Sequence, residues 1–288
     1  MITNAMTIDV EDYFHVAALA ESIKVDEWDA HECRVEANTD ALLALFDEKR
    51  IKSTFFVLGW VAERYPDLVK RIAAAGHEVA SHGFSHQLVY KQTPEVFRDE
   101  TRRSKDLLES LIQAPVDGYR AASYSITAQS RWALDILVEL GFVWDSSIFP
   151  VNHDRYGMPG TPELPYRLKT DNGGEIIEFP LSTAKLLGRT IPIAGGGYFR
   201  LFPYWFSRWG LGSINRKQEP FIFYLHPWEI DTEQPRVKAS AFSMFRHYNN
   251  LDKCMDRLRN LTDDFQFSTV GDVLRNKQLL PAEPRSGG

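Results

Sequence analysis

Short apolar runs alternate with amphipathic segments along most of this 288-residue chain. Runs rich in β-branched and aromatic residues predict strands over residues 5–10, 53–58, 77–81, 118–121, 142–145, 175–180, 221–226 and 266–269. Segments in which apolar residues recur at helical spacing predict helices over residues 39–49, 60–75, 94–112, 127–140, 242–261 and 270–276. This alternation predicts an α/β fold in which helices cover a parallel sheet. A closed or nearly closed barrel and an open doubly wound sheet both fit the pattern.

Proline and glycine mark the boundaries of several elements. Thr93 followed by Pro94 is typical of a helix start, with the threonine as cap and the proline at the first helical position. The segment at about 149–200 is rich in proline and glycine, which predicts long loops and a hairpin. No internal repeat or interdomain linker is evident. We therefore expect one domain over residues 1–280 and a disordered tail over residues 281–288.

Composition and charge argue against several kinds of function for this chain. Hydrophobic residues make up 44% and charged residues 25% of the chain, which is typical of a soluble globular protein. The formal net charge of −6 argues against a nucleic-acid partner, because phosphate binding needs a basic surface. No G-x-G-x-x-G follows the first strand, so the usual sign of a dinucleotide fold is missing. With no signal peptide and no membrane-spanning run visible, we expect a cytoplasmic protein.

Polar, titratable side chains follow five of the predicted strands, at the edge where the sites of α/β proteins collect. They are Asp9, Glu11 and Asp12 after the first strand, His82 and His86 after the third, Arg120 after the fourth, Asp145 after the fifth, and His226 after a later one. Ordinary loops would not place such groups with this regularity. We therefore expect these residues to meet at one edge of the sheet.

The first two groups suit a metal site. His82 and His86 are four residues apart, a spacing that aims both imidazoles at one point on a helical turn or tight loop. Two histidines and a carboxylate form a good ligand set for zinc or another divalent transition metal. Asp9 and Glu11 point the same way in a strand, so one can bind the metal while the other takes a proton from water. The alternatives are a pair of core or surface histidines and merely solvated acidic residues.

Three further groups have candidate roles. Arg120 can hold a carboxylate in a bidentate fork, with a surface salt bridge of little consequence as the alternative. Asp145 and His226 can form an orienter and acid pair, in which the aspartate fixes the imidazole tautomer. Gly195–Gly197 followed by Tyr198 predicts either a tight turn or a surface with aromatics that stack on sugar rings.

These groups, in this order, resemble the motifs of the polysaccharide deacetylase family (carbohydrate esterase family 4, which includes nodulation deacetylases) over most of the chain. The matching segments are Thr7-Ile8-Asp9-Val10-Glu11-Asp12, Ser81-His82-Gly83-Phe84-Ser85-His86, Arg120-Ala121-Ala122-Ser123-Tyr124, Asp145 and Leu225-His226. The His-x-x-x-His motif after an acidic strand is fairly specific, whereas the later motifs are specific only through their order. Asp-Val-Glu-Asp-Tyr-Phe, Arg-Ala-Ala-Ser-Tyr-Ser and His-Pro-Trp-Glu also resemble the subgroup from bacterial exopolysaccharide loci with exosortase systems.

The resemblance implies an irregular (β/α) barrel and a role for each motif. The implied catalytic groups are the base Asp9, its orienting partner Arg120, the acid His226 and that acid's partner Asp145. The implied substrate-binding residues are Ser123 and Tyr124. The implied metal ligands are His82, His86 and one carboxylate, with Zn²⁺ as the expected ion and Co²⁺ or Ni²⁺ as alternatives.

The first motif departs from the family pattern, in which two aspartates often stand side by side. Val10 follows Asp9 here, so the metal-binding carboxylate is either Glu11 or Asp12. Strand geometry favours Glu11, whereas a turn directly after Asp9 would favour Asp12. The third motif lacks its usual prolines, which leaves the shape of the acyl pocket open.

The resemblance implies a metal-dependent hydrolase that removes N-acetyl groups from an N-acetylhexosamine-containing glycan or its precursor. Association with a membrane-bound polysaccharide assembly system is compatible with this activity. A small-molecule hydrolase of cyclic amides or ureides on the same barrel and a non-catalytic glycan-binding protein are the alternatives. A glycosidase fits less well, because it leaves His82, His86 and His226 without a role.

Overall fold

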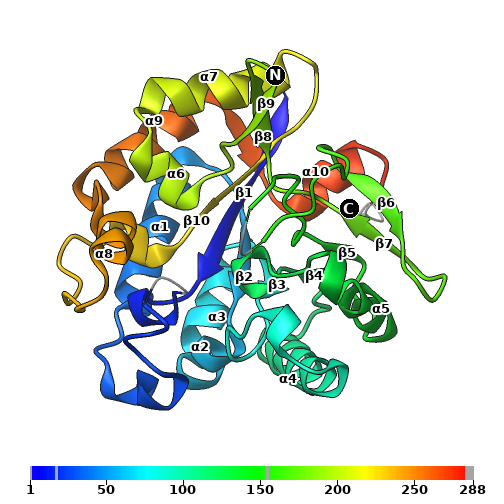
Figure 1. The fold of residues 1–288 in the computed structure, drawn as a ribbon, viewed down its shortest axis with the longest axis horizontal. Coiled ribbons are helices and arrows are strands. Elements are labelled where there is room, and N and C mark those ends of the chain that lie inside the picture. The colour runs from blue at the N-terminus through cyan, green and yellow to red at the C-terminus, as the bar shows by residue number, and fades with distance from the viewer. Residues whose placement is uncertain (1, 17–18, 154–155, 283–288) are drawn as a thin grey trace.

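One mostly parallel sheet organises the computed structural model, which describes residues 2–16, 19–153 and 156–282 (Figure 1). The strand order is β10-β1-β2-β3-β4-β5-β7-β6, and β11 pairs with the start of β1. The strands are β1 (Thr3–Val10), β2 (Thr54–Val57), β3 (Glu78–Ser81), β4 (Gly118–Tyr119), β5 (Trp144–Asp145), β6 (Tyr166–Lys169), β7 (Glu175–Glu178), β10 (Ile222–Leu225) and β11 (Gln266–Ser268). Only β6, against β7, is antiparallel among these described strands. The predicted α/β fold with a parallel sheet is therefore confirmed.

The sheet is not closed by hydrogen bonds. Within the described residues no ladder joins β6 to β10, the two ends of the strand order. A separate antiparallel hairpin is formed by β8 (Thr183–Leu186) and β9 (Arg189–Pro192). Of the predicted tail, residues 283–288 lie outside the described residues.

Side chains along β1 alternate between the two faces of the sheet. Met6, Ile8 and Val10 are buried in the larger hydrophobic cluster, which includes residues of the surrounding helices. Thr7 and Asp9 point to the opposite face, where both accept hydrogen bonds from Arg120. The inner face is therefore polar toward the carboxyl end of β1, which is where a site is expected.

Helices are arranged around the curved sheet, as Figure 1 shows. They are α1 (Val35–Lys49), α2 (Gly59–Arg64), α3 (Pro66–Ala74), α4 (Pro94–Ile112), α5 (Trp132–Glu139), α6 (Gly196–Leu201), α7 (Tyr204–Asn215), α8 (Ala241–Tyr248), α9 (Cys254–Asp264) and α10 (Val270–Asn276). Thr93 caps α4 by accepting a hydrogen bond from the Val96 amide, as the Thr-Pro pair predicts. None of the described helices has the length and apolar character needed to cross a membrane.

Two predicted helices are each divided in the structure. Pro66 has no amide hydrogen to donate, and the predicted helix over residues 60–75 is accordingly two helices, α2 and α3. The predicted helix over residues 242–261 ends early, because Asn250 adopts a left-handed backbone with a φ of 53° between α8 and α9. The hydrophobic pattern continues across both breaks, so periodicity alone does not reveal them.

The segment after β5 contains more regular structure than its composition predicts. The expected hairpin is present as β6 and β7, but β8, β9, α6 and α7 are not anticipated by the sequence pattern. At Gly195 the φ is 137°, and an added Cβ would lie 1.9 Å from the Tyr224 carbonyl oxygen. Only glycine permits this approach, which places the start of α6 against β10.

Gly118 provides a test of the sheet packing. A Cβ at this β4 residue would lie 2.0 Å from the ring of Trp144 in β5. The Trp144 indole is buried, so it is packed on all sides and cannot easily move away. We predict that Gly118→Ala lowers the free energy of unfolding by about 1–3 kcal/mol, measured by urea denaturation. Gly197→Ala is the control, because an added Cβ there meets nothing within 4 Å. Equal stability of the two variants would contradict this account of the β4–β5 contact.

Candidate active site

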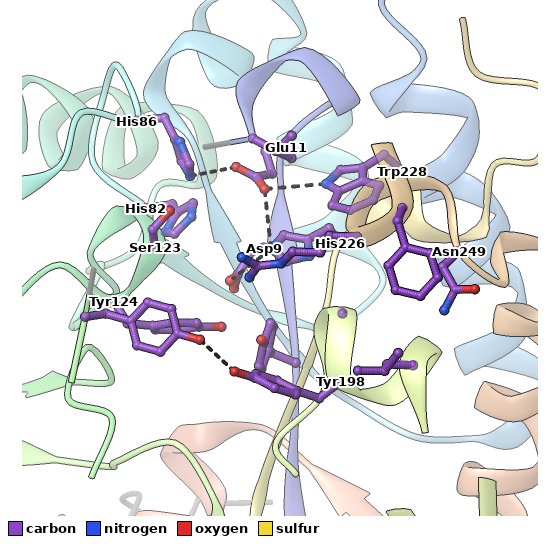
Figure 2. A pocket seen from close by; sticks show the side chains of 17 residues that line it. Asp9, Glu11, His82, His86, Ser123, Tyr124, Tyr198, His226, Trp228 and Asn249 are labelled. Atoms are coloured by element: carbon purple, nitrogen blue, oxygen red, sulfur yellow. Dashed lines mark hydrogen bonds and ion pairs between the residues drawn. The ribbon is translucent and has the colours of Figure 1, made fainter. Parts of the chain in front are cut away.

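The carboxyl ends of several parallel strands open into one pocket (Figure 2). Its lining carboxylates and imidazoles are Asp9 and Glu11 at the end of β1, His82 and His86 after β3, and His226 after β10. Arg120 lies behind Asp9, in contact with its carboxylate. The structure therefore brings together most of the residues that the strand-end pattern predicts. Asp12 and Asp145 are the exceptions.

Arg120 fixes the position of Asp9. Its Nη1 donates to Asp9 Oδ1 at 2.6 Å and to Thr7 Oγ1 at 2.8 Å. Its other nitrogens donate to the backbone and side-chain oxygens of Ser146, and the guanidinium lies 4.0 Å from the centroid of the Phe56 ring. The arginine is fully buried and Asp9 is 2% exposed. A buried charge of this kind is tolerated only with such a complete set of partners, so the carboxylate is held rigidly.

Glu11, His82 and His86 form a compact group of potential metal ligands. One ligand atom from each lies within 4.8 Å of the others, and His86 Nε2 is 2.7 Å from Glu11 Oε2. The Nδ1 of His82 donates to the Arg120 carbonyl at 2.9 Å, which leaves its Nε2 unprotonated and free to bind an ion. Burial lowers the pKa of His82 to about 4, so this imidazole is neutral. Burial alone would raise the pKa of Glu11, but His86, His226 and His82 lower it far below its usual range.

Asp12 is turned away from this group. Its Oδ1 accepts from the Tyr13 amide at 2.8 Å, and its Oδ2 accepts from the amides of Arg34 and Val35 at 2.5 and 2.8 Å. Asp12 thus caps the short helical turn at Tyr13–His15 and anchors the start of α1. The alternative in which Asp12 is the metal-binding carboxylate does not fit the structure, because backbone amides occupy both of its oxygens. Glu11 remains as the predicted ligand.

The partner of His226 is Glu229, not Asp145. His226 Nδ1 donates to Glu229 Oε1 at 2.7 Å, while Nε2 faces Glu11 Oε1 at 3.3 Å and Asp9 Oδ2 at 3.8 Å. Burial disfavours the imidazolium, but Glu11, Glu229 and Asp9 together raise the pKa of His226 to about 9. The protonated ring therefore predominates near neutral pH in the metal-free protein.

Arg200 in turn holds Glu229. Its Nε lies 2.5 Å from Glu229 Oε2, and both side chains are buried. Burial would raise the pKa of Glu229, but Arg200 and His226 lower it to about 2. The sequence carries one signal for Glu229: it stands three residues after His226, with Pro227 between, which is the spacing of a capping box. No local signal identifies Arg200, because its partner is distant in the chain.

The predicted pairing of Asp145 with His226 is wrong. The Asp145 carboxylate accepts from the Ser147 hydroxyl at 2.6 Å and from the Ser147 amide at 3.2 Å. In the sheet, Asp145 lies in register with Glu178 of the neighbouring strand. Burial raises the pKa of Asp145 to about 6, and burial together with the neighbouring Asp145 raises the pKa of Glu178 well above its usual range. Asp145 thus supports the segment after β5 and does not reach the acid.

Aromatic side chains form the walls of the pocket. Ser123 and Tyr124, predicted to bind substrate, line it in left-handed backbone conformations with φ of 51° and 55°. Tyr198, from the glycine-rich turn, lines it as well, and the Trp228 ring stacks on His226 with centroids 5.4 Å apart. Figure 2 shows these residues around the carboxylate and histidine group. Tyr198 of the glycine-rich turn is therefore part of the pocket wall.

Two known families match different parts of the chain. Residues 26–142 match the family described as polysaccharide deacetylase, and residues 146–275 match a domain of unknown function, DUF3473. A peptidoglycan deacetylase from Helicobacter pylori is 30% identical over 113 residues, covering 39% of this chain and 38% of that protein. A chitooligosaccharide deacetylase from Rhizobium leguminosarum bv. trifolii is 31% identical over 99 residues, covering 34% of this chain and 43% of its own length. The chain thus spans less than half of each of these relatives.

Solved structures support the fold over nearly the whole chain. A Mycobacterium smegmatis protein assigned as a polysaccharide deacetylase matches with a TM-score of 0.59 at 17% identity, covering 100% of this chain and 96% of that one. Peptidoglycan deacetylase PdaC from Bacillus subtilis matches with a TM-score of 0.52 at 13% identity, covering 96% and 92%. At these identities the likeness concerns the fold alone.

The contrast between Glu11 and Asp12 is testable by metal binding. We predict that Glu11→Ala weakens zinc affinity, measured by calorimetry, by more than the roughly 10–100-fold that loss of an outer-shell partner costs. Asp12→Asn keeps that affinity but lowers the free energy of unfolding by about 1–3 kcal/mol, because at least one buried amide loses its acceptor. Loss of zinc binding in Asp12→Asn with Glu11→Ala unaffected would reverse the assignment.

The partner of His226 is testable by titration of the metal-free protein. We predict that Glu229→Gln lowers the pKa of His226 below its value of about 9, whereas Asp145→Asn leaves it unchanged, as followed by the imidazole NMR signals. Because the folded-state pKa is raised, the imidazolium stabilises the wild type at low pH, and this stabilisation is lost as the pH rises toward 9. In Glu229→Gln, the free energy of unfolding should fall less than in the wild type as the pH rises toward 9. If only Asp145→Asn shifted the pKa of His226, Asp145 and not Glu229 would be the partner of His226.

Proposed function

We propose that this chain, which carries a polysaccharide deacetylase domain, is a metal-dependent hydrolase that removes N-acetyl groups from an N-acetylhexosamine-containing glycan or its precursor. The observation that carries the proposal is the joint placement of a buried carboxylate, a Glu-His-His group and a histidine hydrogen-bonded to Glu229 in one pocket. Each group has a separate role in hydrolysis of an amide. Exopolysaccharide biosynthesis is the proposed context, in line with the motifs of the exosortase-locus subgroup.

The residues present fit a divalent metal. His82 is neutral, its tautomer is set by the Arg120 carbonyl, and the buried Glu11 Oε2 lies 2.7 Å from His86 Nε2. A carboxylate and two imidazoles whose ligand atoms lie this close together form a suitable set for a divalent cation. We propose Glu11, His82 and His86 as ligands and Zn²⁺ as the ion. A zinc ion polarises a carbonyl and lowers the pKa of water from 15.7 to about 7.

The side chains around this group divide the proton transfers between them. Asp9, aimed by Arg120, accepts the proton of the attacking water. His226 delivers its Nε2 proton to the nitrogen of the leaving amine. Glu229 holds His226 Nδ1 and so keeps Nε2 directed into the pocket. Ser123 and Tyr124 are proposed to contact the acyl group and the sugar.

The first test is acetate release from N-acetylglucosamine oligomers by the purified protein. We predict release that stops with a chelator and returns when zinc or cobalt is restored. Asp9→Asn should reduce kcat by roughly 10²–10⁴-fold, the usual effect of removing a positioned base. His226→Ala should also reduce kcat but keep zinc binding, whereas His82→Ala should lose zinc.

The outcomes separate the proposal from its competitors. Stoichiometric zinc without acetate release from any oligomer would favour a different acyl substrate. Neither zinc binding nor acetate release would favour a non-catalytic glycan-binding protein. Acetate release that is indifferent to chelator would contradict the metal-dependent mechanism.

A further inference from the structure

Helix α8 (Ala241–Tyr248) exposes its apolar side and buries a polar one. Successive residues are about 100° apart around a helix, so Phe242 and Phe245 lie roughly opposite His247. His247 is 1% exposed and donates its Nε2 hydrogen to Gln234 Oε1 at 2.6 Å, whereas Phe242 and Phe245 are 68% and 55% exposed. A helix on a protein surface normally buries its apolar side and exposes its polar side. Large aromatic side chains kept in water on one helix face indicate a surface that a partner covers.

This aromatic face forms part of the rim of the proposed active site. Phe245 lines the pocket together with Arg246 and Asn249 of the same segment. Across the pocket, Leu201 at the end of α6 also lines it and is 46% exposed. Figure 1 shows α6 and α8 beside each other at one side of the sheet, and the two helices are in contact. The exposed apolar surface and the pocket mouth therefore share one side of the molecule.

The charge of this segment differs from that of the whole chain. Residues 232–249 contain one acidic residue, Glu233, and three basic residues, Arg236, Lys238 and Arg246, although the chain as a whole carries a net charge of −6. All three basic residues are exposed, and Arg246 lies over the Phe242 ring, 5.5 Å from its centroid. Aromatic side chains flanked by arginine and lysine are typical of a helix that lies in the interface of an anionic membrane.

We propose that the exposed face of α8, formed by Phe242, Phe245 and the flanking basic residues, docks on a bilayer that contains anionic lipid. The aromatic rings enter the headgroup region, and Arg236, Lys238 and Arg246 contact lipid phosphates. Docking in this orientation brings the pocket mouth to the membrane surface. If the site acts as proposed above, the substrates it favours are glycans held at a membrane, and this extension rests on that function.

The test is co-sedimentation of the full chain with phosphatidylcholine vesicles, with and without phosphatidylglycerol. We expect binding only to the anionic vesicles, weakened at high salt because the cationic contribution is screened. Phe242→Asp should lower the partition coefficient at least roughly tenfold, through loss of apolar burial and repulsion by the lipid. Leu187→Asp is the matched control, because Leu187 is 95% exposed and lies in the β8–β9 turn, outside the proposed face. It should bind as the wild type does.

Catalysis and docking are separable in this experiment. Phe242 does not line the pocket, so Phe242→Asp should release acetate from short soluble oligomers at the wild-type rate. Asp9→Asn, expected to be inactive, should sediment as the wild type does. Wild-type protein that stays in the supernatant with anionic vesicles would overturn the proposal. Equal binding by wild type and Phe242→Asp, or equal losses in Phe242→Asp and Leu187→Asp, would overturn it as well.

Discussion

The buried guanidinium of Arg120 is the group on which the rest of the site depends. It lies on the inner face of the sheet and binds oxygens of Asp9 and Thr7 in β1 and of Ser146 after β5. Its own carbonyl accepts from His82 after β3. Removing Asp9 would leave the guanidinium charge unpaired in the interior, at a cost of several kcal/mol. One side chain thus holds the ends of several strands in a single arrangement.

The position of Glu11 beside His82 and His86 follows from how β1 ends. At Val10 the chain makes a tight turn in which the Glu11 amide donates to the Asp9 carbonyl at 2.9 Å. Asp9 and Glu11 therefore both face the pocket, while Asp12 is directed toward the amides that begin α1. Glu11 is therefore the carboxylate that lies beside His82 and His86.

His226, the proposed acid, is connected to the pocket rim through Glu229 and Arg200. This arginine pairs with Glu229 and also donates to the backbone carbonyls of Arg246, His247 and Asn249. The orientation of His226 and the position of the carboxyl end of α8 therefore depend on the same buried charge. The groups come from separate parts of the chain: Asp9 and Glu11 precede the polysaccharide deacetylase match, and Arg200, His226 and Glu229 lie within DUF3473. The sheet joins both matched segments.

The sequence by itself determined the fold class, most strand positions and the set of polar groups at the strand ends. This was possible because apolar periodicity and strand-end position are local properties, and parallel strands bring their carboxyl ends to one edge. Only the tertiary structure decided that Glu11 and not Asp12 faces the histidines, and that Glu229 and not Asp145 holds His226. These choices depend on which donors the rest of the fold supplies: the Arg34 and Val35 amides for Asp12, Ser147 for Asp145, and Arg200 for Glu229. A carboxylate in the interior is oriented by partners that are remote in the chain, and no local pattern records them.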